Sequence, residues 1–256
     1  MSDTSFLYEK PPGAALAELP GIDYLQFLAE LGHYLQPSSY LEIGTNSGAS
    51  LQRIQCDALC IDPEFNVEAS PLGKRRRSLF FQMPSDAFFA QYEVRSFFPA
   101  GVDLAFLDGM HWFEFLLRDF INTERACHPR SLILLHDCLP QNLRMAERVN
   151  REDPQEDART RYNWTGDVWR MLPILKMHRP DLQVRILDCP PTGLVAVSRL
   201  DPQNDVLSRA YHTILEEFAA LELEAYGIAK LRTLFPMLET RAICRPEVLT
   251  SVFTIR

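Results

Sequence analysis

The chain has 256 residues, of which 46% are hydrophobic and 23% charged, and its net charge is −8. These proportions are ordinary for a globular protein, and the length suffices for one large domain with an extension. The acidic balance argues against nucleic-acid binding through phosphate neutralisation, and no apolar run is long enough to cross a membrane. The first residues, MSDTSFLYEKPPG, lack the basic and apolar regions of a signal peptide.

The cysteines indicate a cytoplasmic protein. None of the six forms a CxxC pair, and they are spread over apparent strands and helices. This pattern favours reduced thiols, several of them buried, and a zinc site is not expected. The six are Cys56, Cys60, Cys127, Cys138, Cys189 and Cys244.

Two segments precede the first predicted strand. Residues 1–21 are polar and interrupted by prolines, so we expect an N-terminal arm. Residues 22–35 carry apolar side chains at helical spacing, which predicts a helix that packs on a sheet.

The stretch Tyr40–Gly48, YLEIGTNSG, predicts a strand, a tight glycine turn and a helix that runs to about Gln55. Gly44 permits a positive φ, and Gly48 lets the backbone approach a ligand closely. The turn therefore suits a polar or anionic ligand held by backbone N–H groups at a helix N-terminus.

The second predicted strand, residues 58–61, ends in Asp62, which lies 20 positions after Glu42. A carboxylate at this place can accept hydrogen bonds from both hydroxyls of a ribose. The alternative is that Asp62 only turns the chain before Pro63. The basic run 74–77 that follows is interpreted as a solvated surface loop rather than a phosphate site.

A third strand is predicted over 79–82, and Ser85 and Asp86 then begin a helix as an N-cap pair. Two nearly all-apolar runs follow, VDLAFL at 102–107 and SLILL at 131–135, as expected of parallel strands covered on both faces. They end near Asp108 and Asp137. The aromatic and aliphatic residues from Phe113 onward have helical spacing and are interpreted as core.

The remaining segments are a polar insertion or mobile cover, a helix, a closing strand pair and a C-terminal helical extension. The apolar surface of that extension must pack on the domain or on another subunit, so a homodimer through these helices is one expectation. The insertion or cover is 144–165, the helix is 166–177, the strand pair is 184–188 with 194–198, and the C-terminal extension is 204–256.

Five motifs at strand ends together resemble those of class I S-adenosylmethionine-dependent methyltransferases. The motifs are YLEIGTNSG, CIDPEF, LAFLDGMH, ILLHDC and PTGLVAV. The resemblance is narrower to the group that contains catechol and macrolide-sugar O-methyltransferases, and it spans roughly residues 24–200. It implies an α/β fold: a doubly wound, Rossmann-like, seven-stranded, mostly parallel sheet with an antiparallel closing hairpin. We expect the methyltransferase domain at 22–203. The G-x-G-x-x-G spacing of nicotinamide oxidoreductases is absent.

The resemblance also implies S-adenosylmethionine as the cofactor. Related enzymes read the adenine edge with a polar side chain at the position of Ser85 and Asp86. The expected cofactor-binding residues are Glu42, Gly44, Thr45, Asn46, Gly48, Ser50, Asp62, Ser85, Asp86 and Asp108.

A metal site is expected at Asp108 and Asp137. The strands that carry them are neighbours in the implied order, about 4.8 Å apart, so the two carboxylates can converge on Mg²⁺ or Ca²⁺. In metal-dependent relatives the next position holds an Asn or Asp ligand, whereas here it is Cys138, and a thiol is a poor Mg²⁺ ligand. This departure leaves the metal requirement open.

His111 and Asp108 are the expected catalytic residues. His111 stands three residues after Asp108, where catechol methyltransferases place a lysine, and a histidine suits removal of a hydroxyl proton near neutral pH. The alternative is that His111 only caps the helix that begins near Trp112. His136 is expected to point away from the site, unless the strand has already turned, because neighbours on a strand face opposite ways.

The expected function is O-methylation of a small hydroxylated metabolite of sugar or polyketide type, with the aromatic tract 163–169 either a lid over the acceptor or part of the core. The alternative is a non-catalytic S-adenosylmethionine-binding or assembly protein that uses its C-terminal helices as an interface. The sequence does not identify the methyl acceptor.

Overall fold

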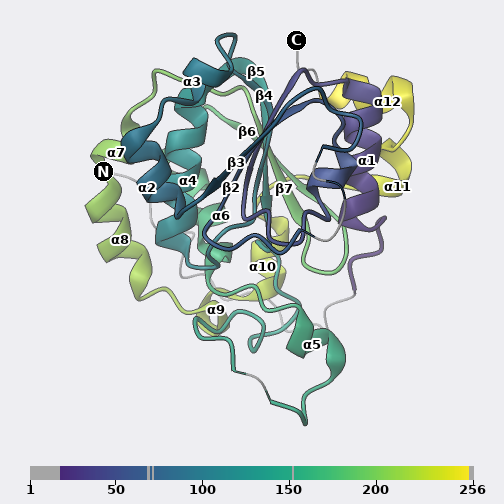
Figure 1. Ribbon diagram of the computed structural model, residues 1–256. Coiled ribbons are helices and arrows are strands. Elements are labelled where there is room, and N and C mark those ends of the chain that lie inside the picture. The colour runs from purple at the N-terminus through teal and green to yellow at the C-terminus, as the bar shows by residue number, and fades with distance from the viewer. Residues whose placement is uncertain (1–17, 68–69, 71, 152, 254–256) are drawn as a thin grey trace.

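The computed structural model describes residues 18–67, 70, 72–151 and 153–253. Its centre is an eight-stranded sheet in the order β3-β2-β1-β4-β5-β7-β6-β8 (Figure 1). The first five strands pair in parallel, and β7 runs antiparallel to both of its neighbours. The strands are β1 (Ser39–Ile43), β2 (Asp57–Asp62), β3 (Ser78–Gln82), β4 (Val102–Leu107), β5 (Cys127–His136), β6 (Gln183–Leu187), β7 (Leu194–Ser198) and β8 (Met237–Leu238).

Helices cover both faces of this sheet (Figure 1). One face packs on α1 (Tyr24–Leu35), the 3₁₀ turn η2 (Leu51–Arg53), α11 (Thr240–Ile243) and α12 (Pro246–Val252). The other packs on α2 (Ser85–Gln91), α3 (Val94–Phe97), α4 (Phe113–Ala126), η3 (Val168–Arg170), α6 (Met171–His178), α7 (Val206–Arg209), α8 (Tyr211–Ala219), α9 (Leu223–Tyr226) and α10 (Ile228–Thr233). A short helix, α5 (Ala158–Tyr162), lies in a segment that projects beyond one end of the sheet (Figure 1).

The sheet divides the buried apolar residues into two cores. Successive side chains of a strand point to opposite faces, so Leu41 and Ile43 of β1 enter one core, and Tyr40 enters the other. Every residue of β1 and β4 is buried, which explains their nearly unbroken apolar sequences. The predicted doubly wound α/β architecture with its antiparallel hairpin is therefore confirmed.

The helix predicted from Gly48 to Gln55 was wrong, because the chain there forms only the 3₁₀ turn η2. Asn46 and Gly48 both have positive φ, at 41° and 76°, and β2 already begins at Asp57. These turns leave too few residues for a full helix. The face it would have covered is covered instead by α1 and by the C-terminal α11 and α12.

The C-terminal segment is not purely helical as predicted, because Met237 and Leu238 form an eighth strand beside β6. Apolar side chains of α7 to α10, such as Ile214 and Phe218, are buried in the chain's own core. A dimer is therefore not needed to bury that surface. Of the predicted N-terminal arm, residues 1–17 lie outside the described residues, and the predicted domain boundaries stay predictions.

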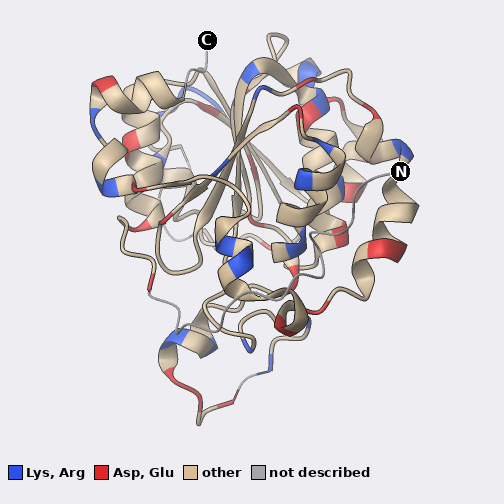
Figure 2. Cartoon of the chain, turned by 180° about the vertical axis from the view of Figure 1, so that it is seen from behind, with Lys and Arg blue, Asp and Glu red and all other residues tan. Residues whose placement is uncertain are grey.

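Acidic and basic residues are interspersed along the helices and loops rather than gathered by sign (Figure 2). Within the basic run, the prediction of a solvated loop fails for Arg75, which is 4% exposed. Its guanidinium donates to the carbonyl oxygens of Leu51 and Ile54, and so ties η2 to the loop before β3. All six cysteines are free, and four are buried. No helix among the described residues is long and apolar enough to span a membrane.

Candidate active site

A cleft of about 810 Å³ opens at the carboxyl ends of the central parallel strands. This is where open α/β sheets bind ligands, because the loops that follow neighbouring strands diverge there. Residues from the ends of β1, β2, β4 and β5 line it, together with the start of α2 and the segment after α5. Of the predicted site residues, it brings together Gly44, Asn46, Asp62, Ser85, Asp86, Asp108, His111 and Asp137.

Gly44 makes the turn at the floor of the cleft, with φ at 87°. A Cβ at this position would lie 1.9 Å from the carbonyl oxygen of Asp108, so only glycine fits. The Gly44 N–H donates to the carbonyl of Ile61, and the Asp108 N–H donates to the carbonyl of Ile43. These bonds join the ends of β1, β2 and β4 and fix the spacing of the side chains that follow them.

Asp62 holds the loop after β1 in place. One carboxylate oxygen accepts from the Asn46 N–H at 2.7 Å, and the other accepts from the Glu64 N–H at 2.8 Å. Each oxygen can accept a second hydrogen bond, so the carboxylate can also receive two hydroxyls from the cleft. Capping the turn and binding a ribose are thus compatible uses of this residue.

Ser85 and Asp86 lie at the opposite wall, at the start of α2. Both carboxylate oxygens of Asp86 accept from the guanidinium of Arg118, at 2.8 and 2.7 Å, and Arg118 also contacts the Tyr211 hydroxyl. Beneath Ser85 lies the buried carboxyl of Asp119, whose pKa burial raises to about 7. The wall is therefore held by groups deeper in the protein.

The remaining predicted cofactor residues lie behind the cleft rather than in its lining. Glu42 is fully buried, and one of its oxygens accepts from the Ser50 hydroxyl at 2.6 Å. Its other oxygen, Oε2, is buried and has no hydrogen-bond partner within the described residues. Burial raises the pKa of Glu42 to about 8. Thr45 is buried beside it, and Gly48 faces the side chain of Val67.

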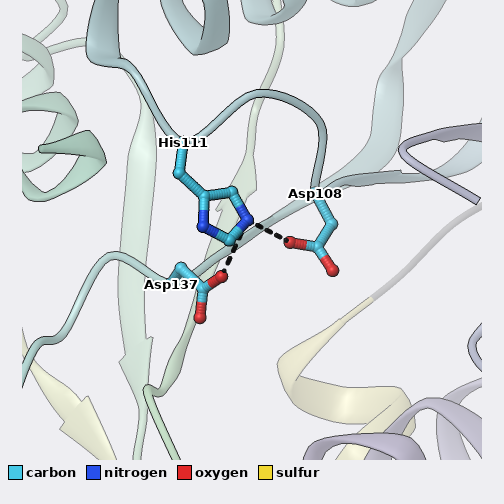
Figure 3. A group of neighbouring side chains, drawn as sticks. All are labelled: Asp108, His111 and Asp137. Carbon is cyan, nitrogen blue, oxygen red and sulfur yellow. Dashed lines mark ion pairs between the residues drawn. The ribbon is translucent and has the colours of Figure 1, made fainter. Parts of the chain in front are cut away.

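Asp108, His111 and Asp137 meet at the ends of β4 and β5 (Figure 3). His111 Nε2 lies 3.4 Å from Asp108 Oδ1 and 3.1 Å from Asp137 Oδ2. His111 Nδ1 donates to the Trp164 carbonyl at 2.9 Å, and the two rings stack with centroids 4.9 Å apart. The backbone bond fixes the ring so that Nε2 faces the two carboxylates.

His136 corrects a prediction, because it points into the cleft instead of away from it. Its Nδ1 lies 3.1 Å from Asp108 Oδ1 and 3.4 Å from Asp137 Oδ2. Asp137 has a φ of 60°, so the strand has already turned and alternation no longer holds. The ring of Tyr24 covers His136, with centroids 4.3 Å apart, and sequence reasoning missed Tyr24 as a cleft residue.

The pKa values of His111, His136 and Asp108 are shifted by burial and by neighbouring charges. Burial lowers the pKa of His111, but Asp137 and Asp108 outweigh it and raise that pKa to about 9. Burial opposes a charge on His136 as well, yet the same carboxylates raise its pKa well above the ordinary value. Burial alone would raise the pKa of Asp108, and the two imidazoles instead hold it below the ordinary value.

Two further predicted features are now placed. The Cys138 thiol is buried and donates to the His136 carbonyl at 3.3 Å, and it does not line the cleft. Two tryptophans of the aromatic tract lie in different places: Trp164 lines the cleft, whereas Trp169 lies in the core at 1% exposure.

A family described as a methyltransferase domain matches residues 41–138. No curated protein sequence matches at a significant level.

Several solved structures are similar to the chain at low sequence identity. One is a Podospora anserina methyltransferase bound to S-adenosylhomocysteine (16% identity, TM-score 0.48, 70% of this chain and 78% of that one). Another is the Streptomyces achromogenes O-methyltransferase of tomaymycin synthesis with S-adenosylmethionine (14% identity, TM-score 0.45, 68% of this chain and 78% of that one). A third is a Bacillus cereus O-methyltransferase with S-adenosylhomocysteine (15% identity, TM-score 0.42, 70% of this chain and 83% of that one).

Proposed function

We propose that this chain is a class I S-adenosylmethionine-dependent methyltransferase that transfers the cofactor's methyl group to a hydroxyl of a small metabolite of sugar or polyketide type. One observation carries the proposal. A single cleft holds Asp62 at the end of β2 and, beyond the Gly44 turn, the cluster formed by His111 with Asp108 and Asp137. The first suits a ribose, and the second suits a reacting hydroxyl.

The cofactor half of the cleft runs from Asp62 to Ser85. The Asp62 carboxylate would accept from the ribose hydroxyls, and its orientation is set by the backbone N–H groups of Asn46 and Glu64. Ser85 and Asp86, at the start of α2, would contact the adenine. The glycine at position 44 leaves room for the rest of the cofactor to pass over the end of β1.

The acceptor half favours an uncharged substrate. Among the residues that the structure describes, the lining of the cleft includes five carboxylates and two imidazoles but neither Lys nor Arg. A phosphate or carboxylate on the acceptor would meet these carboxylates, and the charges of the two imidazoles are already paired with Asp108 and Asp137. The rings of Tyr24, Tyr162 and Trp164 give this half an apolar wall, on which a sugar or polyketide ring can pack.

The reaction is an in-line displacement at the sulfonium methyl. The acceptor oxygen forms a bond to the methyl carbon, the carbon–sulfur bond breaks, and S-adenosylhomocysteine leaves. The hydroxyl proton must go to a base, and His111 Nε2 is placed to take it when the ring is neutral, which its pKa of about 9 makes the minor form at neutral pH. The chain's own part is to align oxygen, methyl and sulfur and to exclude water.

Magnesium, the ion expected from the sequence, does not suit this donor set. Mg²⁺ prefers oxygen ligands in near-octahedral geometry. Here an imidazole nitrogen, His111 Nε2, stands between the two carboxylates, and Cys138 is turned away from them.

The proposal is tested by methyl transfer from labelled S-adenosylmethionine to a panel of hydroxylated sugars, macrolide aglycones and phenols. We expect turnover with a neutral acceptor and a loss of about 100-fold or more in kcat for His111→Gln. His128→Gln is the matched control, since His128 pairs with Asp103 away from the cleft, and it should leave turnover unchanged. Intact turnover in Asp108→Ala would contradict the mechanism. Cofactor binding without transfer to any acceptor would favour the non-catalytic alternative.

A further inference from the structure

Arg118 of α4 lies beside the wall that would contact the adenine, without lining the cleft itself. Its Nε and Nη2 donate to the two carboxylate oxygens of Asp86, at 2.8 and 2.7 Å. Its guanidinium also packs on the ring of Phe115, at 4.3 Å from the ring centroid. Asp86 and Phe115 both line the cleft. Because two parallel N–H···O bonds fix the plane of a carboxylate as well as its position, Arg118 sets how Asp86 faces the cleft.

The third contact of Arg118 comes from the C-terminal segment. Its Nη1 donates to the hydroxyl of Tyr211, the first residue of α8 and 93 positions away along the chain. That hydroxyl in turn donates to the carbonyl oxygen of Glu114 at 3.2 Å, so it both accepts and donates a hydrogen bond. Tyr211 lies outside residues 41–138, which match the methyltransferase family. Helix α8 therefore reaches the cleft wall through Arg118.

The paired Asp86 carboxylate can only accept hydrogen bonds from a ligand in the cleft. Adenine carries an amine at C6, which donates N–H bonds to such an acceptor. Hypoxanthine is the same flat ring system with a carbonyl oxygen at C6, and this oxygen would face the carboxylate as a second acceptor. A wall built in this way distinguishes the two bases at C6, because one of them leaves polar groups unpaired.

We propose that Arg118 and Tyr211 are positioning residues for the cofactor's purine, and that through Asp86 they select a base with an amine at C6. The Asp86 side chain is 42% exposed and that of Arg118 28%. A carboxylate this exposed turns toward water when nothing holds it, so its direction depends on the guanidinium. The inference rests on the proposed function in placing the cofactor's adenine against this wall.

The test compares two ligands that differ only at C6 of the purine, S-adenosylhomocysteine and S-inosylhomocysteine. Each is titrated calorimetrically into the full chain. We expect the parent to bind the adenine form about 10- to 100-fold more tightly, as for a hydrogen bond to a charged group at a partly exposed site. In Arg118→Met this preference should fall to about threefold or less, while S-inosylhomocysteine affinity changes little. Methionine keeps an apolar stem on Phe115 but has no N–H donors.

Two further variants accompany this change. Tyr211→Phe keeps the ring and removes only the hydroxyl, and should lower the preference by about threefold. Arg209→Met is the matched control, since Arg209 forms an ion pair with Asp205 at 2.7 Å away from the cleft, and its preference should equal that of the parent. Circular dichroism and the melting temperature show whether each variant is folded.

Equal affinity of the parent for both ligands would overturn the inference. So would an unchanged preference in Arg118→Met, or an equal loss of affinity for both ligands, which is what a merely structural role of Arg118 would produce. The two proposals remain separable in this experiment. Binding of S-adenosylhomocysteine without a preference at C6 would refute this inference alone, whereas a folded parent that binds neither ligand would refute the proposed function.

Discussion

Replacing Glu42 by Gln should make the protein less sensitive to rising pH. The Glu42 carboxyl is buried behind the glycine turn, and its pKa is raised from 4.5 to about 8. In the unfolded chain the same carboxyl loses its proton near 4.5. Between these values the unfolded state has released a proton that the folded state still holds, so folding stability falls as pH rises from about 4.5 to 8.

The magnitude follows from the size of the shift. A difference of 8 − 4.5 = 3.5 pKa units corresponds to about 5 kcal/mol, at about 1.4 kcal/mol per unit. Part of this loss has already occurred at pH 5, so about 4 kcal/mol falls between pH 5 and pH 8.5. Glutamine at position 42 has the same shape and does not ionise. It can still accept the hydrogen bond from the Ser50 hydroxyl.

Urea unfolding of the parent and of Glu42→Gln at pH 5 and pH 8.5 measures the effect. We expect the stability of the variant relative to the parent to increase by about 4 kcal/mol across this range. The exposed Glu216→Gln gives the effect of the same substitution at the surface. A constant difference between Glu42→Gln and the parent would refute the reasoning, because it would mean that Glu42 is ionised in the folded protein.

Other substitutions test the cleft and its support. Asp62→Asn removes the charge that ribose hydroxyls would contact, and should weaken S-adenosylhomocysteine binding by about tenfold or more in calorimetry; equal affinity would contradict the ribose assignment. Gly44→Ala places a Cβ 1.9 Å from a backbone oxygen and should lower the melting temperature more than Gly48→Ala, whose Cβ would meet only a side chain at 3.3 Å. Arg179→Ala leaves the buried Glu124 carboxylate without its 2.6 Å partner and should cost about 3–5 kcal/mol in urea unfolding; a loss below about 1 kcal/mol would argue against that burial.

The sequence predicts the strand-end acids well, for a simple physical reason. Strands β4 and β5 are nearly continuous apolar runs, so their ends are visible in the sequence as the first acids that follow. Asp62, Asp108 and Asp137 all lie in the cleft as expected. Their convergence depends only on the strand order, which the motif series implied.

His136 shows where local reasoning fails. Alternation along a strand predicts that His136 and Asp137 face opposite ways, but Asp137 adopts a φ of 60° and brings both into the cleft. A positive φ at a residue other than glycine has no reliable signal in the neighbouring sequence. Tyr24 and Trp164 were equally hard to place in the cleft, because segments distant in the sequence deliver them.

The errors in the fold have a similar origin. A helix after Gly48 was predicted from the strand and the glycine turn that precede it, yet α1, α11 and α12 already cover that face. Helix α12 lies far along the chain from α1 and packs on it, a contact that no local sequence pattern encodes. Arg75 was judged by its basic neighbours, although buried carbonyl groups of the η2 turn bind its guanidinium.

The central claim is that the cleft at the ends of β1 and β2 binds S-adenosylmethionine. The most direct test is calorimetric titration of the chelator-treated parent protein with S-adenosylhomocysteine, the product form of that cofactor. We predict one binding site per chain with a dissociation constant in the micromolar range. Absence of binding in protein whose folding has been verified by circular dichroism would contradict the account.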